Sequence, residues 1–210
     1  MLPLFTIFFS SFVIALSGAL MPGPLLTVTI SESPRRGLAT GPLLIAGHAL
    51  LEMALVIGIF LGLAPLLRQP GVFTAIAISG AAILVWMAAG MIRALPTLSL
   101  APDREGPHGR SLLMTGILMS LANPYWIIWW VTIGLGYILQ SHQYGLWGVA
   151  FFFAGHILAD FVWYTGVSTA VAKGGRLLTD RIYRGLTGAC AGFLILFAGY
   201  FLYAGIKEFI

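Results

Sequence analysis

The stretch Gly47-His48-Ala49-Leu50-Leu51-Glu52 decides the architecture, because it returns later in the chain as Gly155-His156-Ile157-Leu158-Ala159-Asp160. The two copies are 108 residues apart (155 − 47 = 108). Two further matches keep the same offset without a gap, and they pair Gly58 with Gly166 and residues 79–81 with residues 187–189. Such self-similarity at a fixed spacing predicts an internal repeat that covers the chain.

Each repeat holds three apolar runs that are long enough to cross a bilayer, which takes about 20 helical residues. Because three is an odd number, the second repeat must insert upside down relative to the first, as in many secondary transporters. We therefore predict an all-α polytopic membrane protein, with a first half at 1–100, a cytoplasmic linker at 101–110 and a second half at 111–210. The predicted spans are 4–30, 38–66, 72–94, 111–138, 145–171 and 183–206.

Composition agrees with a chain that lives in lipid. Hydrophobic residues make up 59% of the 210 residues and charged residues 9%, and the mean hydropathy is +0.96, so the polar surface of a soluble domain is missing. Cys190 is the only cysteine, which excludes an internal disulfide, a CxxC redox pair and a thiolate metal cluster within one chain. No Lys or Arg precedes the run from Leu4 to Leu20, so we interpret this run as a membrane helix rather than a cleaved signal.

The basic residues predict the orientation. Six spans place nine of them on one side and two on the other, and the positive-inside rule assigns the richer side to the cytoplasm. Both termini are therefore expected outside. Because these residues sit in short loops rather than along one face, we expect a lipid partner and no nucleic acid. The nine are Arg35, Arg36, Arg93, Arg104, Arg110, Lys173, Arg176, Arg181 and Arg184, and the two are Arg68 and Lys207.

The repeated motif carries the candidate chemistry. His48 and Glu52 are four residues apart, so they share one helix face, and His156 and Asp160 do the same. Counting along the helices places all four about 15 to 23 Å from the helix starts, near the bilayer middle. Ionisable groups at that depth cost at least about 2.5 kcal/mol each, so they are expected to face one another or a wet cavity. We predict a substrate-binding or proton-coupling site, and the alternative is a pair of structural hydrogen bonds.

Prolines interrupt the first and the fourth span, at Pro22-Gly23-Pro24 and at Asn123-Pro124. A proline has no N–H, so carbonyls one turn earlier lose their helical partners, and the amides that start the next half-helix attract anions. One central site could then hold both ends of a zwitterion. The alternative is a pair of kinks resealed by neighbouring side chains. The carbonyls expected to be freed are those of Gly18, Leu20 and Ser120.

Other features predict packing rather than chemistry. Two GxxxG spacings, Gly58 with Gly62 and Gly188 with Gly192, favour close helix approach, and they also leave a homodimer open. No nucleophile elbow, HExxH or phosphate loop is present, so we predict neither an enzyme nor a cofactor. Most of the conspicuous aromatic residues are expected in an interfacial belt, with gating as the alternative. These are Trp129, Trp130, Tyr137, Trp163 and Tyr164.

The Pro-Gly-Pro at 22–24 and the Asn-Pro at 123–124 resemble the lysine exporter (LysE-type) translocator family, which is also similar in length and in its six hydrophobic segments. The resemblance implies efflux of amino acids or similar small metabolites across a prokaryotic inner membrane, driven by a proton or ion gradient. The sequence departs from the family at Tyr125-Trp126, where many amino-acid exporters have a Lys, and in its doubled Gly-His-x-x-x-acid motif. Related proteins export metal ions, so the alternative is a divalent transition-metal exporter that uses His48, Glu52, His156 and Asp160 as ligands.

Overall fold

The protein is described by a computed structural model in which residues 1–63, 69–99, 111–174 and 179–207 are placed. These residues form helices and no strand. An all-helical membrane protein was predicted, and the described residues confirm that class. The predicted linker at 101–110 lies outside the described residues, as do Arg68 and Arg176.

The first half begins with two helices that flank an interruption. α1 ends at Ala19 and α2 starts at Pro24, a position where proline fits because the first helical N–H has no partner in any case. Gly37, at φ 75°, then ends α2 in a conformation that favours glycine. The elements are α1 (Leu2–Ala19), α2 (Pro24–Arg36), the 3-10 turn η1 (Gly37–Ala39), α3 (Thr40–Gly58), the π-helical turn η2 (Ile59–Leu63) and α5 (Pro70–Ala94).

The second half follows the same plan. A short helix ends at Leu121, and the next one starts at Pro124. The Asn123 side chain caps that start, because its Oδ1 accepts a hydrogen bond from the Tyr125 N–H at 3.2 Å. The elements are α6 (Leu112–Leu121), α7 (Pro124–Trp129), the π-helical turn η3 (Trp130–Gly134), α8 (Leu135–His142), α9 (Gly145–Lys173) and α10 (Asp180–Lys207).

Five stretches of the described chain are long and apolar enough to cross a membrane, and α6 with the helices after it adds a sixth if that bent pair is one span. The bend between Leu112–Leu121 and Tyr125–His142 is 68°. Six spans were predicted, and the structure supports five or six. One boundary differs: α1 alone is long enough to span, while Pro24–Gly62 forms one apolar stretch that contains both α2 and α3.

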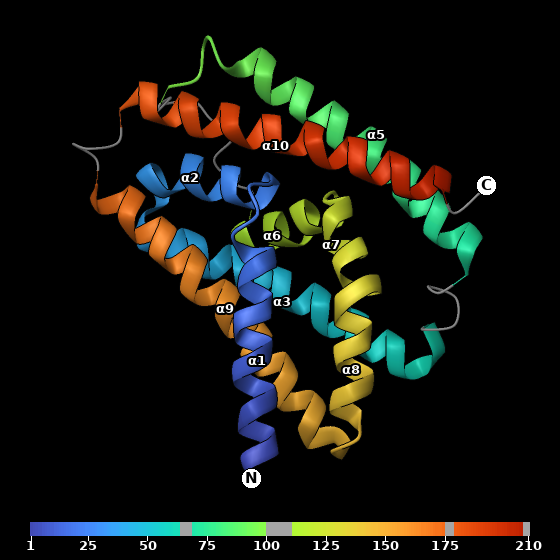
Figure 1. Ribbon diagram of the computed structural model, residues 1–210. Coiled ribbons are helices and arrows are strands. Elements are labelled where there is room, and N and C mark those ends of the chain that lie inside the picture. The colour runs from blue at the N-terminus through green and yellow to red at the C-terminus, as the bar shows by residue number, and fades with distance from the viewer. Residues whose placement is uncertain (64–68, 100–110, 175–178, 208–210) are drawn as a thin grey trace.

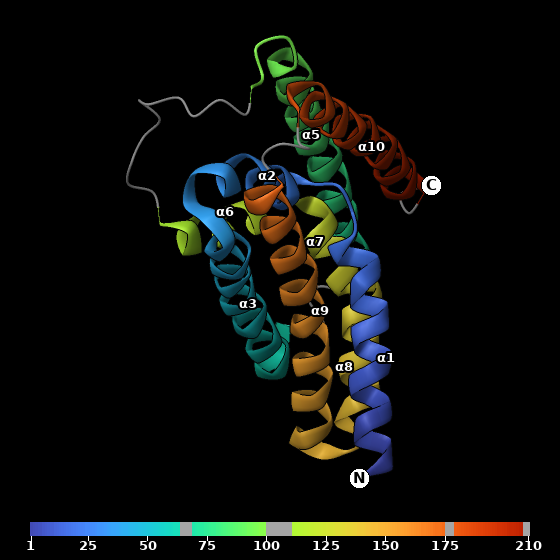
Figure 2. The same ribbon diagram turned by 90° about the vertical axis from the view of Figure 1, so that its left-hand side faces the viewer.

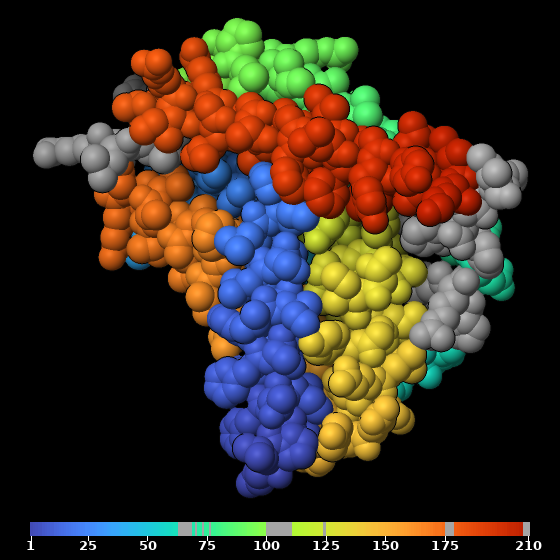
Figure 3. Space-filling view, viewed as in Figure 1, coloured from blue at the N-terminus to red at the C-terminus, as the bar shows by residue number. Residues whose placement is uncertain are grey.

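The helices form two groups. α1 packs along α9, with α3 and α8 beside α9, and these four run down from the middle of the molecule (Figures 1 and 2). α5 and α10 pack along each other, and Figure 1 shows them crossing the direction of α1 steeply. Figure 3 shows α10 lying across the end of α1 and against the α7–α8 segment. The interrupted segments, α2 and α6 with α7, therefore lie between the two groups.

Glycines bring the backbones of neighbouring helices into direct contact. A side chain on Gly47 would overlap the carbonyl oxygen of Leu113 on α6, and one on Gly116 would overlap that of Leu44 on α3. Gly155 packs in the same way on the carbonyl of Phe8 in α1. Both glycines that precede the repeated histidines thus seat their helix on another helix, which fixes where the histidines point.

The predicted GxxxG packing is wrong for two of its four glycines. A Cβ on Gly62 or Gly192 would meet no atom of the described residues within 4 Å, and Gly62 lies at a kink with φ 106°. The homodimer stays a prediction. The end of α2, the end of α9 and the start of α10 gather at one end of the molecule, away from the N-terminus (Figure 1), and the orientation of that end also stays a prediction.

Replacing Gly47 by Ala should destabilise the protein, because the new methyl group overlaps the Leu113 carbonyl and forces α3 and α6 apart. Overpacking of this kind costs about 1–3 kcal/mol, which should lower the midpoint of thermal unfolding in detergent. Gly90→Ala on α5 is the matched control, since its Cβ would meet nothing. A Gly47→Ala protein that melts with the control would contradict the close approach of these helices.

Candidate functional site

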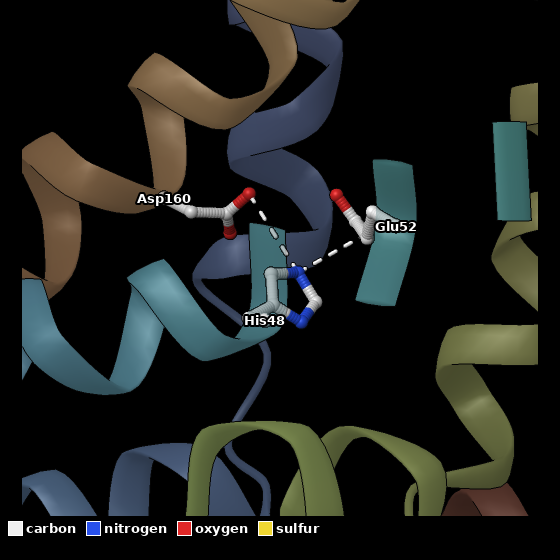
Figure 4. Close-up of side chains that lie close together, drawn as sticks. All are labelled: His48, Glu52 and Asp160. Carbon is white, nitrogen blue, oxygen red and sulfur yellow. Dashed lines mark ion pairs between the residues drawn. The ribbon is translucent and has the colours of Figure 1, made fainter. Parts of the chain in front are cut away.

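The two repeated motifs meet at one carboxylate. His48 Nε2 lies 3.1 Å from Glu52 Oε1, and His156 Nε2 lies 2.9 Å from Glu52 Oε2. Asp160 completes the group, with its Oδ2 4.0 Å from His48 Nε2 and 3.9 Å from His156 Nε2. Figure 4 shows His48 between Asp160 and Glu52. The four residues selected from the sequence are thus together, and each is buried.

Two tryptophans bind the same carboxylate. The indole N–H groups of Trp126 and Trp130 donate to Glu52 Oε1 at 3.0 and 2.8 Å. Trp130 opens the π-helical turn η3, and its ring fills the space that a side chain on Gly134 would need. π-Helical turns of this kind often occur at functional sites. Glu52, which is 1% exposed, therefore accepts from two indoles and faces two imidazoles.

Neither of these tryptophans was predicted as a site residue. Trp129, Trp130 and Tyr164 were expected in an interfacial belt, yet all three are buried, with at most 5% of their surface exposed. Trp126 was not selected at all. Its four-residue spacing from Trp130 puts both indoles on one helix face, and that spacing directly after a proline break is the signal that could have found them.

Ser120 constrains the protonation of His48. The Ser120 hydroxyl lies 2.7 Å from His48 Nδ1 and also donates to the Gly116 carbonyl at 2.7 Å. A hydroxyl has one proton, so both bonds form only if His48 Nδ1 carries a proton and donates it. Nε2 then faces the carboxylates of Glu52 and Asp160. A hydrogen bond between His48 Nε2 and one of these carboxylates requires a proton, either on Nε2 or on the carboxylate. The geometry therefore provides a place for an exchangeable proton.

Three buried polar atoms at this site have no hydrogen-bond partner among the described residues. They are Asp160 Oδ2, His156 Nδ1 and Trp129 Nε1. The Trp129 indole N–H edge faces the end of α1, where it lies 3.6 Å from the Cβ position of Gly18, and its ring packs on His156 with ring centroids 4.7 Å apart. An unsatisfied buried polar group costs about 1–3 kcal/mol, so such atoms suit a site that receives a polar solute.

These groups line one pocket with an empty volume of about 760 Å³, counting the space at its mouth. The two chain interruptions meet at the pocket, since a Cβ on Gly23 would lie 3.6 Å from Asn123 Nδ2. The lining includes Ala15, Gly18, Met21, Pro22, Gly23, Leu25, His48, Glu52, Leu84, Ser120, Asn123, Tyr125, Trp126, Trp129, His156, Asp160, Tyr164, Phe193, Leu194 and Phe197.

The backbone around the interruptions differs from the prediction. The carbonyl of Gly18 accepts from the Met21 N–H, and that of Ser120 accepts from the Asn123 N–H, both at 3.1 Å. Tight i,i+3 bonds at the helix ends thus satisfy two of the three carbonyls that were expected to be free, and the prediction for the third, Leu20, stays a prediction. Asn123 also occupies the first amides of α7, because its Oδ1 bonds the Tyr125 N–H and its carbonyl bonds the Trp126 N–H.

The start of α2 differs from that of α7. Its cap residue, Gly23, has no side chain, and the first intrahelical bond comes from the Thr27 N–H. Helical geometry leaves the amides of Leu25 and Leu26 without an intrahelical partner. Of the predicted break residues, Pro22, Gly23 and Asn123 line the pocket, Pro24 is buried at the start of α2, and Pro124 begins α7.

Comparisons with known proteins agree with a translocator. A family model described as "LysE type translocator" matches residues 16–205. The chain is 26% identical to the "Putative amino acid efflux protein YcgF" of Bacillus subtilis (strain 168) over 96% of this chain and 98% of that protein. It is 28% identical to the "Uncharacterized membrane protein PA4757" of Pseudomonas aeruginosa over 86% of each chain. No solved structure matches it.

Replacing Glu52 by Gln should lower the thermal stability strongly. The amide keeps one acceptor oxygen but turns an N–H₂ group toward one of the imidazoles. The indole and imidazole donors around position 52 then lose the negative charge to which they all bind. Breaking a buried charged network costs about 3–5 kcal/mol. The measurement is thermal unfolding in detergent, with Glu32→Gln as control, because Glu32 pairs with Arg36 in a partly exposed contact. Equal midpoints of thermal unfolding for the two variants would contradict the claim that Glu52 holds the buried network together.

Proposed function

Because the chain belongs to the LysE type translocator family, we propose that it exports amino acids or similar small metabolites in exchange for protons. Family membership makes it a multi-pass membrane transporter and not an enzyme. The proton linkage and the amino-acid substrate are the proposal. The printed name of the Bacillus subtilis relative, an amino acid efflux protein, supports the substrate class.

The observation that carries the proposal is the buried cluster of two histidines and two carboxylates that lines the pocket. Ionisable side chains inside a membrane are costly and mark ion or substrate pathways. Histidine is the side chain whose ordinary protonation equilibrium lies closest to neutral pH. With Nδ1 of His48 committed to Ser120, the exchangeable proton belongs between His48 Nε2 and the carboxylates of Glu52 and Asp160.

Competition between a proton and the ammonium group of the substrate at Asp160 would couple proton entry to substrate export. Its Oδ2 has no hydrogen-bond partner and faces both histidines at about 4 Å. An ammonium group that reaches Asp160 adds a positive charge beside the imidazoles and disfavours a proton on them. A proton that arrives from the other side of the membrane disfavours the ammonium in turn. Binding of one partner therefore releases the other, which is the requirement for exchange.

The proposed architecture is an inverted repeat with both termini outside. α3 packs on α6 and α9 packs on α1, so each motif helix of one half contacts the interrupted segment of the other half. Rocking one half against the other around the shared site would give alternating access, with interruptions near the bilayer middle. The gathered helix ends with Arg35, Arg36, Lys173 and Arg181 would face the cytoplasm.

A second candidate function is export of a divalent transition metal. Ligand atoms of His48, Glu52 and Asp160 lie within 4.8 Å of one another, and imidazole and carboxylate ligands suit zinc, nickel or cobalt. However, Glu52 Oε1 already accepts two indole N–H groups. The N–H that Ser120 requires of His48 leaves Nε2 as the only metal-binding nitrogen of that ring. The network therefore favours a proton and an organic cation.

Asp160→Asn should abolish export driven by a pH gradient while the protein stays folded, because Asp160 Oδ2 has no hydrogen bond to lose. Proteoliposomes loaded with a panel of radiolabelled L-amino acids measure the initial efflux rate with and without the gradient. We expect the variant to fall at least about tenfold, which corresponds to only about 1.4 kcal/mol. Glu32→Gln, far from the pocket, should keep the wild-type rate. Gradient-driven efflux at the wild-type rate in Asp160→Asn would defeat the proton role.

Calorimetric titration of the purified protein with zinc, nickel and cobalt ions should show no binding tighter than millimolar. The reason is that the donors around Glu52 occupy the oxygen a metal would need. His48→Ala serves as the control for weak surface binding, since it removes one proposed ligand. A micromolar site in the wild type that His48→Ala loses would instead favour the metal exporter.

A further inference from the structure

The acidic side of the pocket has room for a single cationic group. Glu52 and Asp160 are the acids among the described lining residues. Glu52 accepts two indoles through Oε1 and faces His156 through Oε2, so most of its acceptor positions are taken. Among the described residues Asp160 Oδ2 finds no hydrogen-bond partner, and Asp160 is 6% exposed. One ammonium group can therefore be bound, and a second would be buried without a partner, which is costly in a membrane.

The pocket also offers donors for one carboxylate. Trp129 Nε1–H, on a residue that is 5% exposed, has no partner and faces the end of α1. Leu25, at the start of α2, also lines the pocket, and the helix dipole there favours an anion. Across the described lining no Lys or Arg is present, and both histidines already face Glu52, so a second carboxylate would lack a counter-charge of its own.

Away from these polar groups, α7 and α10 give the pocket an aromatic wall, which consists of Tyr125, Phe193 and Phe197. The rings of Phe193 and Phe197 stack with centroids 4.6 Å apart, and Tyr125 meets Phe197 edge-on at 5.3 Å. Leu84 and Leu194 extend the same apolar surface. Such a surface favours an aromatic or aliphatic side chain, because it carries no formal charge that could pair with a charged one.

We propose that the pocket selects amino acids with a large apolar or aromatic side chain, with the ammonium on Asp160, the carboxylate on the Trp129 N–H and the side chain on the aromatic wall. This inference rests on the proposed export function, and it names the substrate class. It assigns to Trp129 the recognition of the carboxylate. Amino acids with a second charge, such as lysine and glutamate, are excluded because the pocket would bury that charge unpaired.

The test is equilibrium binding of radiolabelled L-phenylalanine to the purified wild-type protein, independent of any gradient. L-Phenylalanine should bind at least about tenfold more tightly than L-lysine or L-glutamate. Trp129→Phe keeps the ring and removes the donor, so it should weaken L-phenylalanine about tenfold. The same variant should leave the affinity for phenethylamine, which has no carboxylate, unchanged.

Two further variants sharpen the assignment. Phe197→Ala should weaken L-phenylalanine more than L-alanine, because only the larger side chain reaches the aromatic wall. Trp86→Phe is the matched control for Trp129→Phe, since Trp86 on α5 is 75% exposed and lies outside the pocket. It should bind all ligands like the wild type.

The outcomes separate this inference from the export function. L-Lysine or L-glutamate bound as tightly as L-phenylalanine overturns the selectivity, and equal losses of L-phenylalanine and phenethylamine in Trp129→Phe overturn the carboxylate assignment. Gradient-driven efflux of other amino acids, with no L-phenylalanine binding, leaves the export function standing and overturns this inference. The expected binding pattern without any efflux upholds the inference and overturns the export function.

Discussion

A carboxylate inside a membrane protein must be surrounded by donors, and Glu52 shows how much structure that requirement organises. Its two oxygens accept from Trp126 and Trp130 and face the histidines of α3 and α9. The donors come from α3, from α7 with η3, and from α9, so one side chain joins segments from both halves of the chain. Because a bare charge at this depth is so unfavourable, these segments cannot separate independently.

The backbone is shaped to bring those donors in. Gly47 and Gly155 let α3 and α9 approach α6 and α1 closely, one residue before each histidine. Asn123 starts a new helix with its own side chain as cap, and that helix carries Trp126 and Trp129 toward the pocket. Gly134 then makes room for the Trp130 ring within the π-helical turn. Glycines and a cap residue thus set the geometry that the polar groups use.

Much of this could be predicted from the sequence, and the failures have physical causes. Apolar length predicted the helices, and the repeat with its buried charges selected His48, Glu52, His156 and Asp160, because ionisable groups in lipid need each other. Helical spacing gives the face of a residue but not its partner, so Trp130 was assigned to an interfacial belt and Trp126 was not selected. The prolines predicted the interruptions, yet the last turns tightened to reseal the carbonyls of Gly18 and Ser120. Nothing in uniformly apolar segments foretold that α5 and α10 would cross α1.

The two acids at equivalent repeat positions have come to differ. Glu52 is enclosed by donors, whereas Asp160, shorter by a methylene group, stops about 4 Å from the same imidazoles and keeps a bare oxygen. If both halves descend from one duplicated unit, the duplication allowed one acid, Glu52, to bind only groups of the protein, and the other acid, Asp160, to keep an oxygen for a ligand. A symmetric ancestor assembled from two identical units had no such division of labour, so its acids would have had to serve as anchor and ligand at once.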